Sequence, residues 1–87
     1  MKIFKYPVEI TDELTIEMPK NADIMHFGIH NHVAALWACV DPENPMVERK
    51  FKVVGTGHEM PTNDNLNYIG TITNHELQYV WHLFEVI

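Results

Sequence analysis

Short runs in which apolar and polar residues alternate, separated by turn-forming residues, are the feature that most constrains the fold of this chain. In the segment 13–18 (ELTIEM) every second residue is apolar, so an extended strand would have one apolar and one polar face. Helical periodicity is hard to find, because β-branched or aromatic residues interrupt every run of good helix formers. Recurrent strand patterns with short turns between them are typical of an all-β sandwich or barrel.

Turn residues divide the 87-residue chain into segments that fit the strands of one small domain. Pro7 favours an edge strand or a strand end, because proline cannot donate a backbone hydrogen bond to a neighbouring strand. The run 33–40 (VAALWACV) is apolar on both faces, which predicts a central strand or one covered on both sides. We therefore expect residues 1–87 to form one domain, a small antiparallel sandwich or partly open barrel of about seven short strands. The expected strands cover residues 2–10, 12–18, 24–30, 33–40, 47–54, 66–72 and 77–87.

The charge balance and the apolar runs limit the classes of partner. The chain has a formal net charge of −6 with only 6 Lys and Arg residues, so general binding to the phosphate backbone of nucleic acids is not expected. The longest apolar run, 33–40, is too short to span a bilayer, and the first residues contain no apolar stretch typical of a signal peptide. We therefore expect a cytoplasmic protein that does not bind membranes. The single cysteine, Cys39, lies inside that apolar run and is expected to be a small buried side chain.

Three histidines, His26, His30 and His32, lie within seven positions, which raises the question of a metal site. Asn31 tolerates a positive φ angle and lies between two apolar runs, so a two-residue hairpin turn is predicted at Asn31 and His32. Val33 would then pair with His30, and His32 would point away from the other two histidines. His26 and His30 would be about 13 Å apart by strand rise, which is too far to share one ion. We expect neither a metal site nor a cofactor.

The glycines of the segment 55–58 (GTGH) expose backbone N–H groups that could bind an anion such as a phosphate. The only basic segment of the chain, within 47–54, lies directly before it and would add positive charge. The alternative is a strand that ends in a glycine turn, and the P-loop pattern GxxxxGK[ST] is absent from the sequence. The predicted ligand-binding residues are Arg49, Lys50, Lys52, Gly55, Thr56, Gly57 and His58.

The tryptophans and the remaining histidines are candidates for other roles. Trp37 and Trp81 are expected in the core, or at an interface if they are exposed. His82 is expected to be half-buried with a hydrogen-bond partner. The His-Glu pair at 58–59 could act in acid–base chemistry with Tyr68 or His82, but no nucleophile motif accompanies it, so we prefer a non-enzymatic role and leave an enzymatic one open. The predicted interface residues are His30, Asn31, His32, Trp37 and Trp81.

Four segments together resemble a family of small uncharacterised proteins encoded by phages and prophage-bearing bacteria. These segments are KYPVEITDELTIEMP (5–19), LWACVDPENPMVERKFKVVGTGHEMP (36–61), LNYIGTI (66–72) and HLFE (82–85). The resemblance covers nearly the whole chain, and it implies a compact β-rich fold and a phage setting but no activity. The family pattern has Asn-Gly where this chain has Asn31-His32, which agrees with a hairpin turn at that position. It also has glycines near Glu76-Leu77, and their absence here leaves the type of the last turn open.

These observations lead to one preferred function and two alternatives. We expect a small phage-type binding protein without enzymatic activity, which sequesters or blocks a host immune factor or a nucleotide signal. Its partner would be a host protein or a small nucleotide-type ligand, and it would form homo-oligomers through an edge strand. The alternatives are a structural or assembly accessory protein of a virion, and a small histidine-dependent hydrolase.

Overall fold

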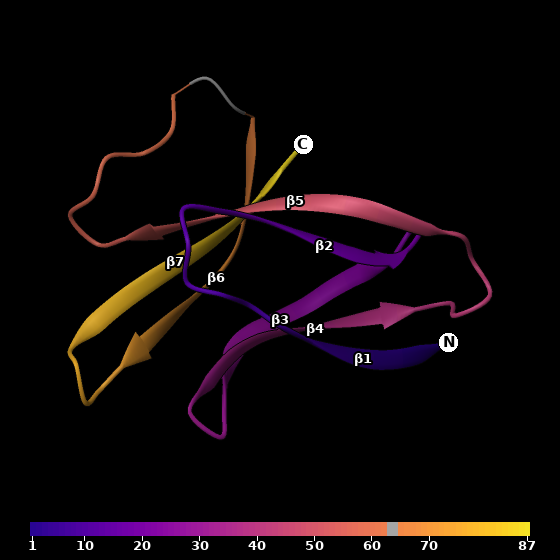
Figure 1. The fold of residues 1–87 in the computed structure, drawn as a ribbon, viewed down its shortest axis with the longest axis horizontal. Helices are drawn as coiled ribbons and strands as arrows, with labels where there is room; N and C mark the ends of the chain where they lie inside the picture. Colours follow the sequence, from indigo (N-terminus) through magenta and orange to yellow (C-terminus); the bar gives the residue numbers. More distant parts are fainter. Residues whose placement is uncertain (63–64) are drawn as a thin grey trace.

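The computed structural model describes residues 1–62 and 65–87, and these residues form antiparallel strands joined by turns and loops, with no helix among them (Figure 1). The all-β prediction is therefore confirmed, and so is the expected number of strands. None of the described residues belongs to a helix that could cross a membrane. The strands are β1 (Lys2–Pro7), β2 (Glu13–Pro19), β3 (Asp23–His30), β4 (Val33–Val40), β5 (Met46–Gly55), β6 (Leu66–Asn74) and β7 (Tyr79–Val86).

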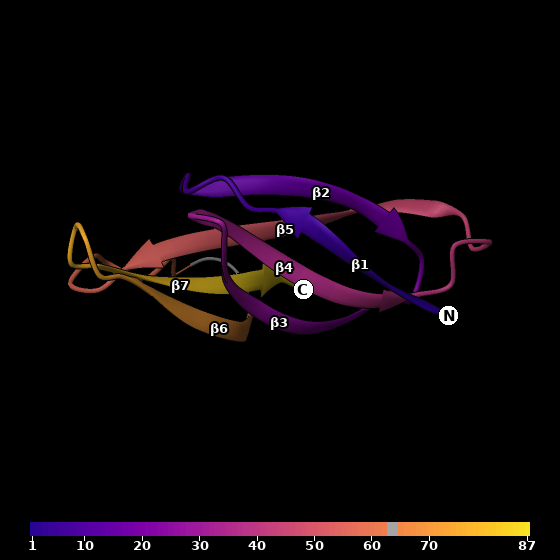
Figure 2. The ribbon, with the colours of Figure 1, turned by 90° about the horizontal axis from the view of Figure 1, so that it is seen from below.

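The strands form two sheets that pack face to face as a sandwich. Sheet A has the strand order β1-β4-β3, and sheet B has the order β2-β5-β7-β6. Figure 2 shows β1 and β2 along one flank of the sandwich, and β3 and β6 along the opposite flank. As predicted, the run 33–40 forms the central strand of its sheet, and Pro7 ends an edge strand.

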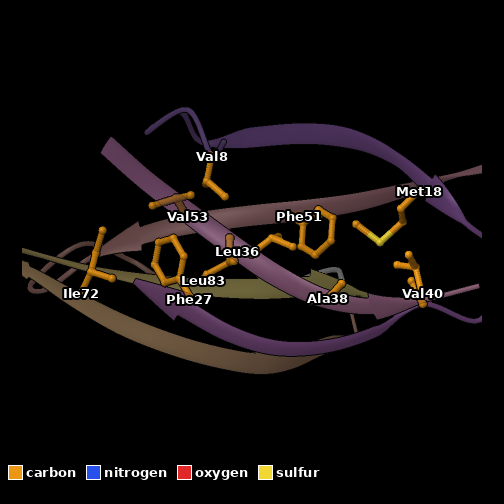
Figure 3. Packing of buried hydrophobic residues seen from close by; sticks show 11 residues of the cluster. Val8, Met18, Phe27, Leu36, Ala38, Val40, Phe51, Val53, Ile72 and Leu83 are labelled. Carbon is orange, nitrogen blue, oxygen red and sulfur yellow. The ribbon is translucent and has the colours of Figure 1, made fainter. Parts of the chain in front are cut away.

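The core lies between the two sheets and is filled by alternate residues of their strands (Figure 3). On β4, Leu36 and Val40 are fully buried, whereas Val33 points to the other face and is exposed. On β5, Phe51 is fully buried and pairs with Leu14 of β2. Burying a large apolar side chain stabilises a fold by about 1.5–3 kcal/mol, so this one layer is the main source of stability. The largest fully buried side chains are Phe51, Met18, Leu36, Leu83 and Val40.

A β-bulge in β3 determines which side chains of that strand face outward. Ile24 pairs with Ala38 of β4. The next partner in β4, Trp37, pairs with His26, so Met25 is an extra residue in β3. Because alternate residues of a strand face opposite sides, the extra residue places His26 on the outer face of sheet A and lets the next residue enter the core.

A second bulge, in β6, lies where the edges of the two sheets meet. The pairing register of β6 shifts between Tyr68 and Gly70. A Cβ on Gly70 would lie 3.2 Å from the Cβ of Phe27, so the close approach of β6 to β3 depends on a residue without a side chain. The register shift also places Thr71 opposite His82 in β7.

The predicted hairpin turn between β3 and β4 is confirmed. His30 pairs with Val33 across the end of the hairpin. Asn31 has a φ angle of 51° and His32 has a φ angle of 64°. Positive φ angles at both central residues are the requirement of a type I′ turn, and that turn matches the twist of the two strands.

The last hairpin differs from its predicted boundaries. β6 continues to Asn74 and β7 begins at Tyr79 rather than at Leu77, so a four-residue turn joins them. The side-chain oxygen Oδ1 of Asn74 accepts hydrogen bonds from the backbone N–H groups of Glu76 and Leu77, both at 3.1 Å. Gln78 then closes the turn with a φ angle of 57°. The hydrogen bonds to the Asn74 side chain thus stabilise this turn without the glycines that the family pattern has near Glu76-Leu77.

Two further predictions concern the loops and the cysteine. The loop over 41–45 is confirmed. The loop predicted over 55–65 begins one residue later, because Gly55 still belongs to β5, and residues 63 and 64 lie outside the described residues. The prediction of a buried Cys39 is wrong, because this side chain is partly exposed. It lies on the outer face of sheet A, opposite Ile3 of β1.

Candidate functional site

A cleft with a volume of about 760 Å³ lies between β3 and β6. Its lining includes residues of the β3–β4 turn and of the β6–β7 turn, and these two hairpins project separately at the same end of the sandwich (Figure 1). A cleft of this size is in the range of sites for small molecules or for a segment of a partner protein. Its lining residues are His26, Phe27, Gly28, Ile29, His32, Thr71, Ile72, Thr73, Asn74, His75 and Glu76.

Imidazole rings dominate the polar lining of this cleft. His26 comes from β3, His32 from the β3–β4 turn and His75 from the β6–β7 turn, where Glu76 adds a carboxylate. Within 1–62 and 65–87, no group of three or more His, Cys, Asp or Glu side chains is placed to hold a metal ion. The cleft therefore offers hydrogen-bond donors and acceptors on an otherwise apolar floor.

Large apolar side chains are exposed around the ends of the same two hairpins. Leu77 is 64% exposed and Tyr79 is 54% exposed, both at the β6–β7 turn. Ile29 and Val33, which flank the β3–β4 turn, are 43% and 53% exposed. Apolar groups gathered around a cleft are a property of surfaces that bind another molecule.

His82 lies in a hydrogen-bonded chain on the outer face of sheet B, near the cleft residue Thr71. The His82 Nε2 atom is 2.8 Å from Oγ1 of Thr56, and its Nδ1 atom is 2.9 Å from Oγ1 of Thr71. The Thr71 hydroxyl also forms a hydrogen bond of 2.5 Å with the Tyr68 hydroxyl. This confirms the prediction that His82 is half-buried with a hydrogen-bond partner. These hydrogen bonds join three segments that lie apart in the sequence, namely GTGH, LNYIGTI and HLFE.

A hydroxyl beside an imidazole is the arrangement that activates a nucleophile, but a triad also needs a group that orients the base. Both ring nitrogens of His82 already bind hydroxyl groups, so no carboxylate orients this ring. His58, which could have taken part in such chemistry, lies elsewhere: its ring contacts Trp81 edge-on, with 6.4 Å between the ring centroids. The arrangement around His82 therefore resembles a cross-strand hydrogen-bond network more than a catalytic triad.

The predicted anion-binding loop is a closed turn. The His58 N–H donates a hydrogen bond of 3.0 Å to the Gly55 carbonyl oxygen. Gly57 has a φ angle of 89°, as the third residue of a type II turn requires. The Thr56 N–H donates to the Val80 carbonyl oxygen at 3.0 Å. Two of the amides that an anion would need are thus used within the protein, which favours the alternative of a strand ending in a glycine turn.

Arg49 is separated from the other predicted cationic ligands. Its Nε and Nη2 atoms donate to the two carboxylate oxygens of Glu85 at 2.6 and 2.7 Å, and its Nη1 atom donates to the Ala22 carbonyl oxygen at 2.5 Å. The hydrogen bond to Glu85 raises the pKa of the Arg49 guanidinium above its ordinary value. Lys50 and Lys52 alternate with Arg49 along β5 and therefore point to the opposite face of sheet B.

Lys52 and His58 do come together, at a smaller cavity of about 380 Å³. The same cavity is also lined by Asp12, Glu13 and Glu59. Glu13 is the cross-strand partner of Lys52. Because three carboxylates accompany the two basic side chains, the charge around this cavity does not favour an anionic ligand.

The predicted interface residues separate into two groups. Trp37 is partly exposed on the outer face of sheet A, with its ring centroid 5.6 Å from that of His26 and 6.5 Å from that of His30. Trp81 lies on the inner face of sheet B and packs against the core. The structure therefore brings Trp37 and His30 together beside the turn 31–32, and it leaves Trp81 apart from them.

The fold and these surfaces define a small antiparallel β-sandwich domain with a cleft large enough for a ligand between β3 and β6. Its sequence places it in a particular family: the chain belongs to the family described as a domain of unknown function, DUF7352, whose sequence model matches residues 1–87. No curated protein and no solved structure matches the chain. Membership in this family agrees with the expected relation to uncharacterised proteins.

Proposed function

We propose that this protein is a non-enzymatic binding protein. Its binding surface is the end of the sandwich formed by the β3–β4 and β6–β7 hairpins, and it acts by binding a partner protein there. In the phage setting that the family resemblance suggests, the partner is a host immune factor in the cytoplasm of the infected cell, and its activity is blocked while it is bound.

The observation that carries this proposal is the cleft together with its exposed apolar rim. A handful of apolar and aromatic side chains supplies most of the free energy of a protein interface, and the polar groups around them fix the orientation of the partner. Leu77 and Tyr79 on one hairpin, with Ile29 and Val33 on the other, are arranged as such anchors around the polar cleft. These four side chains are exposed in the folded protein, so burying them against a partner would stabilise the complex.

The lining of the cleft favours binding over catalysis. Its imidazoles come from three different segments and are not joined to a serine, cysteine or carboxylate in the way that a hydrolase requires. The threonines of β6 that line the cleft are exposed hydroxyls, one of which is already held by His82. These groups can recognise the main chain of a partner without any bond being broken.

The test compares the wild-type protein with two single variants as baits in extracts of infected bacteria that carry antiviral defence systems. Leu77→Asp places a charge at the hairpin end. Met46→Asp introduces the same charge at the other end of the sandwich, where Met46 is 57% exposed, and it is the matched control. A partner identified with the wild-type bait is then purified, and its affinity for all three proteins is measured.

We expect Leu77→Asp to weaken the affinity at least tenfold, which corresponds to about 1.4 kcal/mol, and Met46→Asp to leave it unchanged. Equal binding by both variants would contradict the proposal. If the captured partners are virion proteins, the role is that of an assembly accessory instead. A rise in melting temperature with cyclic dinucleotides or ADP-ribose-type compounds, without any protein partner, would assign the cleft to a nucleotide signal.

Homo-oligomerisation is a separate part of this proposal. β1 and β2 are each hydrogen-bonded to a neighbouring strand on one side only, so their flank of the sandwich has free backbone groups that a second copy could pair with. Sedimentation equilibrium of the purified protein at several concentrations measures the mass in solution. A mass equal to that of one chain throughout the range would contradict this part and leave the hairpin-end proposal intact.

A further inference from the structure

The outer face of sheet A carries a row of three side chains that the proposed function does not use as a unit. Trp37 lies on the central strand β4, and its cross-strand partners are Lys5 on β1 and His26 on β3. Residues paired directly across a sheet point to the same face, so the indole is flanked by an ammonium group on one side and an imidazole on the other. Trp37 itself is partly exposed.

The floor beneath these rings is made of the smallest residues. A Cβ on Gly28 would lie only 2.6 Å from Nε2 of His26, so the His26 ring lies directly over Gly28. Ala35, the cross-strand partner of Gly28, is 2% exposed although it lies on the outer face, which means that larger neighbours cover it. The rings of His26 and Trp37 are thus packed on a flat surface and do not stand free in solvent. A packed aromatic surface loses little conformational entropy when a ligand stacks on it.

The charged group nearest to Trp37 on this face is a cation, whereas the whole chain is acidic. The Lys5 Nζ atom is 3.2 Å from Nδ1 of His30, whose ring also contacts Trp37. Asp23, the only acidic residue in the three strands of sheet A, lies opposite Cys39 at the end of β3 away from the turn, and its negative charge acts on Arg49. In a chain with a net charge of −6, this face therefore combines an aromatic ring with a cationic side chain.

We propose that the outer face of sheet A binds a free mononucleotide, with the base stacked against Trp37 and the phosphate bound by Lys5 and His30. A planar base stacks on an exposed aromatic side chain whatever its sequence context, and a phosphate accepts charge-assisted hydrogen bonds from a lysine. The acidic remainder of the chain disfavours a long nucleic acid strand, so the ligand is a single nucleotide. Only His26 and the floor residue Gly28 are shared with the hairpin-end cleft, and neither is among the groups that bind the nucleotide, so either proposal can fail without the other.

The experiment follows the two tryptophan indole N–H signals in ¹H–¹⁵N correlation spectra while adenosine 5′-monophosphate is added. Trp37 and Trp81 report on different surfaces, and Trp37→Phe assigns the signals. Adenosine and inorganic phosphate are titrated separately, because each carries one half of the proposed ligand. Lys5→Gln removes the cation beside Trp37, and Lys20→Gln, at an exposed turn of β2–β3, is the matched control with the same change of charge.

We expect the nucleotide to shift the Trp37 signal in a saturable way and to leave the Trp81 signal in place. Lys5→Gln should weaken binding about fivefold relative to Lys20→Gln, the effect of losing one charge-assisted contact at a partly exposed site. Adenosine or phosphate alone should bind more weakly than the nucleotide. The absence of a saturable shift at millimolar nucleotide would overturn the proposal. So would equal affinities of the two lysine variants, or binding of either half-ligand as tight as that of the nucleotide.

Discussion

The guanidinium of Arg49 and the carboxylate of Glu85 form a bidentate ion pair on the inner face of sheet B, with N–O distances of 2.6 and 2.7 Å. Their side chains are 21% and 12% exposed, so the pair is largely shielded from water. The third contact of the guanidinium, to the Ala22 carbonyl oxygen, links β5 to the turn before β3. One arginine thus connects β5 and β7 of sheet B to the turn that leads into sheet A.

We expect Glu85→Ala to lower the free energy of unfolding by about 3 kcal/mol, because it leaves the Arg49 charge between the sheets without its partner. The double variant Arg49→Met with Glu85→Leu should lose clearly less, since neither charge then has to be desolvated. Urea unfolding followed by tryptophan fluorescence measures both values. A double variant that is less stable than Glu85→Ala would contradict this account of the pair.

The turn residue His32 offers a stabilising substitution. His32 has a φ angle of 64°, a conformation that costs a residue with a Cβ roughly 1 kcal/mol and glycine almost nothing. We expect His32→Gly to raise the free energy of unfolding by about 0.5–1 kcal/mol. His75→Gly is the control, because His75 lies in the other hairpin turn without a positive φ angle and should gain nothing. Thermal unfolding of both variants checks this, and equal shifts would refute the explanation.

Gly70 and Gly28 each face another residue closely, and they should respond differently to the same substitution. The Cβ of Gly70→Ala would lie 3.2 Å from the Cβ of Phe27, which cannot move without shifting the β3 backbone. We expect a loss of about 2 kcal/mol from this overpacking. In Gly28→Ala the new Cβ meets the far end of the His26 ring, which can rotate away, so the loss should be smaller. Equal losses in urea unfolding would show that the β3–β6 approach is not tight.

A pair of like charges in sheet B predicts a second stabilising change. Glu17 of β2 lies directly opposite Glu48 of β5, and both side chains are exposed. Like charges in direct cross-strand pairs repel, so Glu48→Lys should stabilise the fold by about 0.5 kcal/mol at low salt, and the gain should shrink at 1 M salt. Glu9→Lys alters the net charge equally without an opposing carboxylate across a strand, and it should give a smaller gain. The comparison is made by thermal unfolding at both salt concentrations.

Tyr6 of β1 should produce a small loss of stability at alkaline pH. It packs against the core, and burial raises the pKa of its phenol. The folded state therefore holds this proton more tightly than the unfolded state does, so the contribution is complete below about pH 10 and is lost as the pH rises further. In Tyr6→Phe the stability between about pH 9 and 11 should fall less steeply than in the wild type. Identical slopes would assign the alkaline loss to other groups.

Much of the fold could be predicted from alternation and turn chemistry alone. The segment 13–18 forms a half-buried strand as its pattern indicates, and the Asn31-His32 turn is where local preference places it. The two bulges could not be predicted, because the extra residues Met25 and Ile69 look like any other apolar strand residue. A bulge is determined by which partner strand lies alongside, and that information is not local in the sequence.

The candidate site was harder to predict than the fold for the same reason. Lys5 and His30 are separated by 25 positions, and Thr71 and His82 by 11, so no spacing rule links them. The basic residues of 47–54 are neighbours in the sequence, but strand alternation sends Arg49 to the inner face and its lysine neighbours to the outer face. The glycines of the GTGH loop indicate a turn, and only the tertiary structure reveals that two of its amides are already hydrogen-bonded.

The bulge at Met25 determines two properties of β3 at once: which side chains lie on the outer face of sheet A, and which enter the core. If Met25 paired with Trp37 as a regular strand residue, the alternation would continue unbroken, so His26 would enter the sandwich and Phe27 would face water. Loss of Met25 would leave a regular strand in which His26 still pairs with Trp37, so the bulge absorbs one extra residue. The histidine surface of this protein therefore depends on where that extra residue leaves the pairing as much as on the histidines themselves.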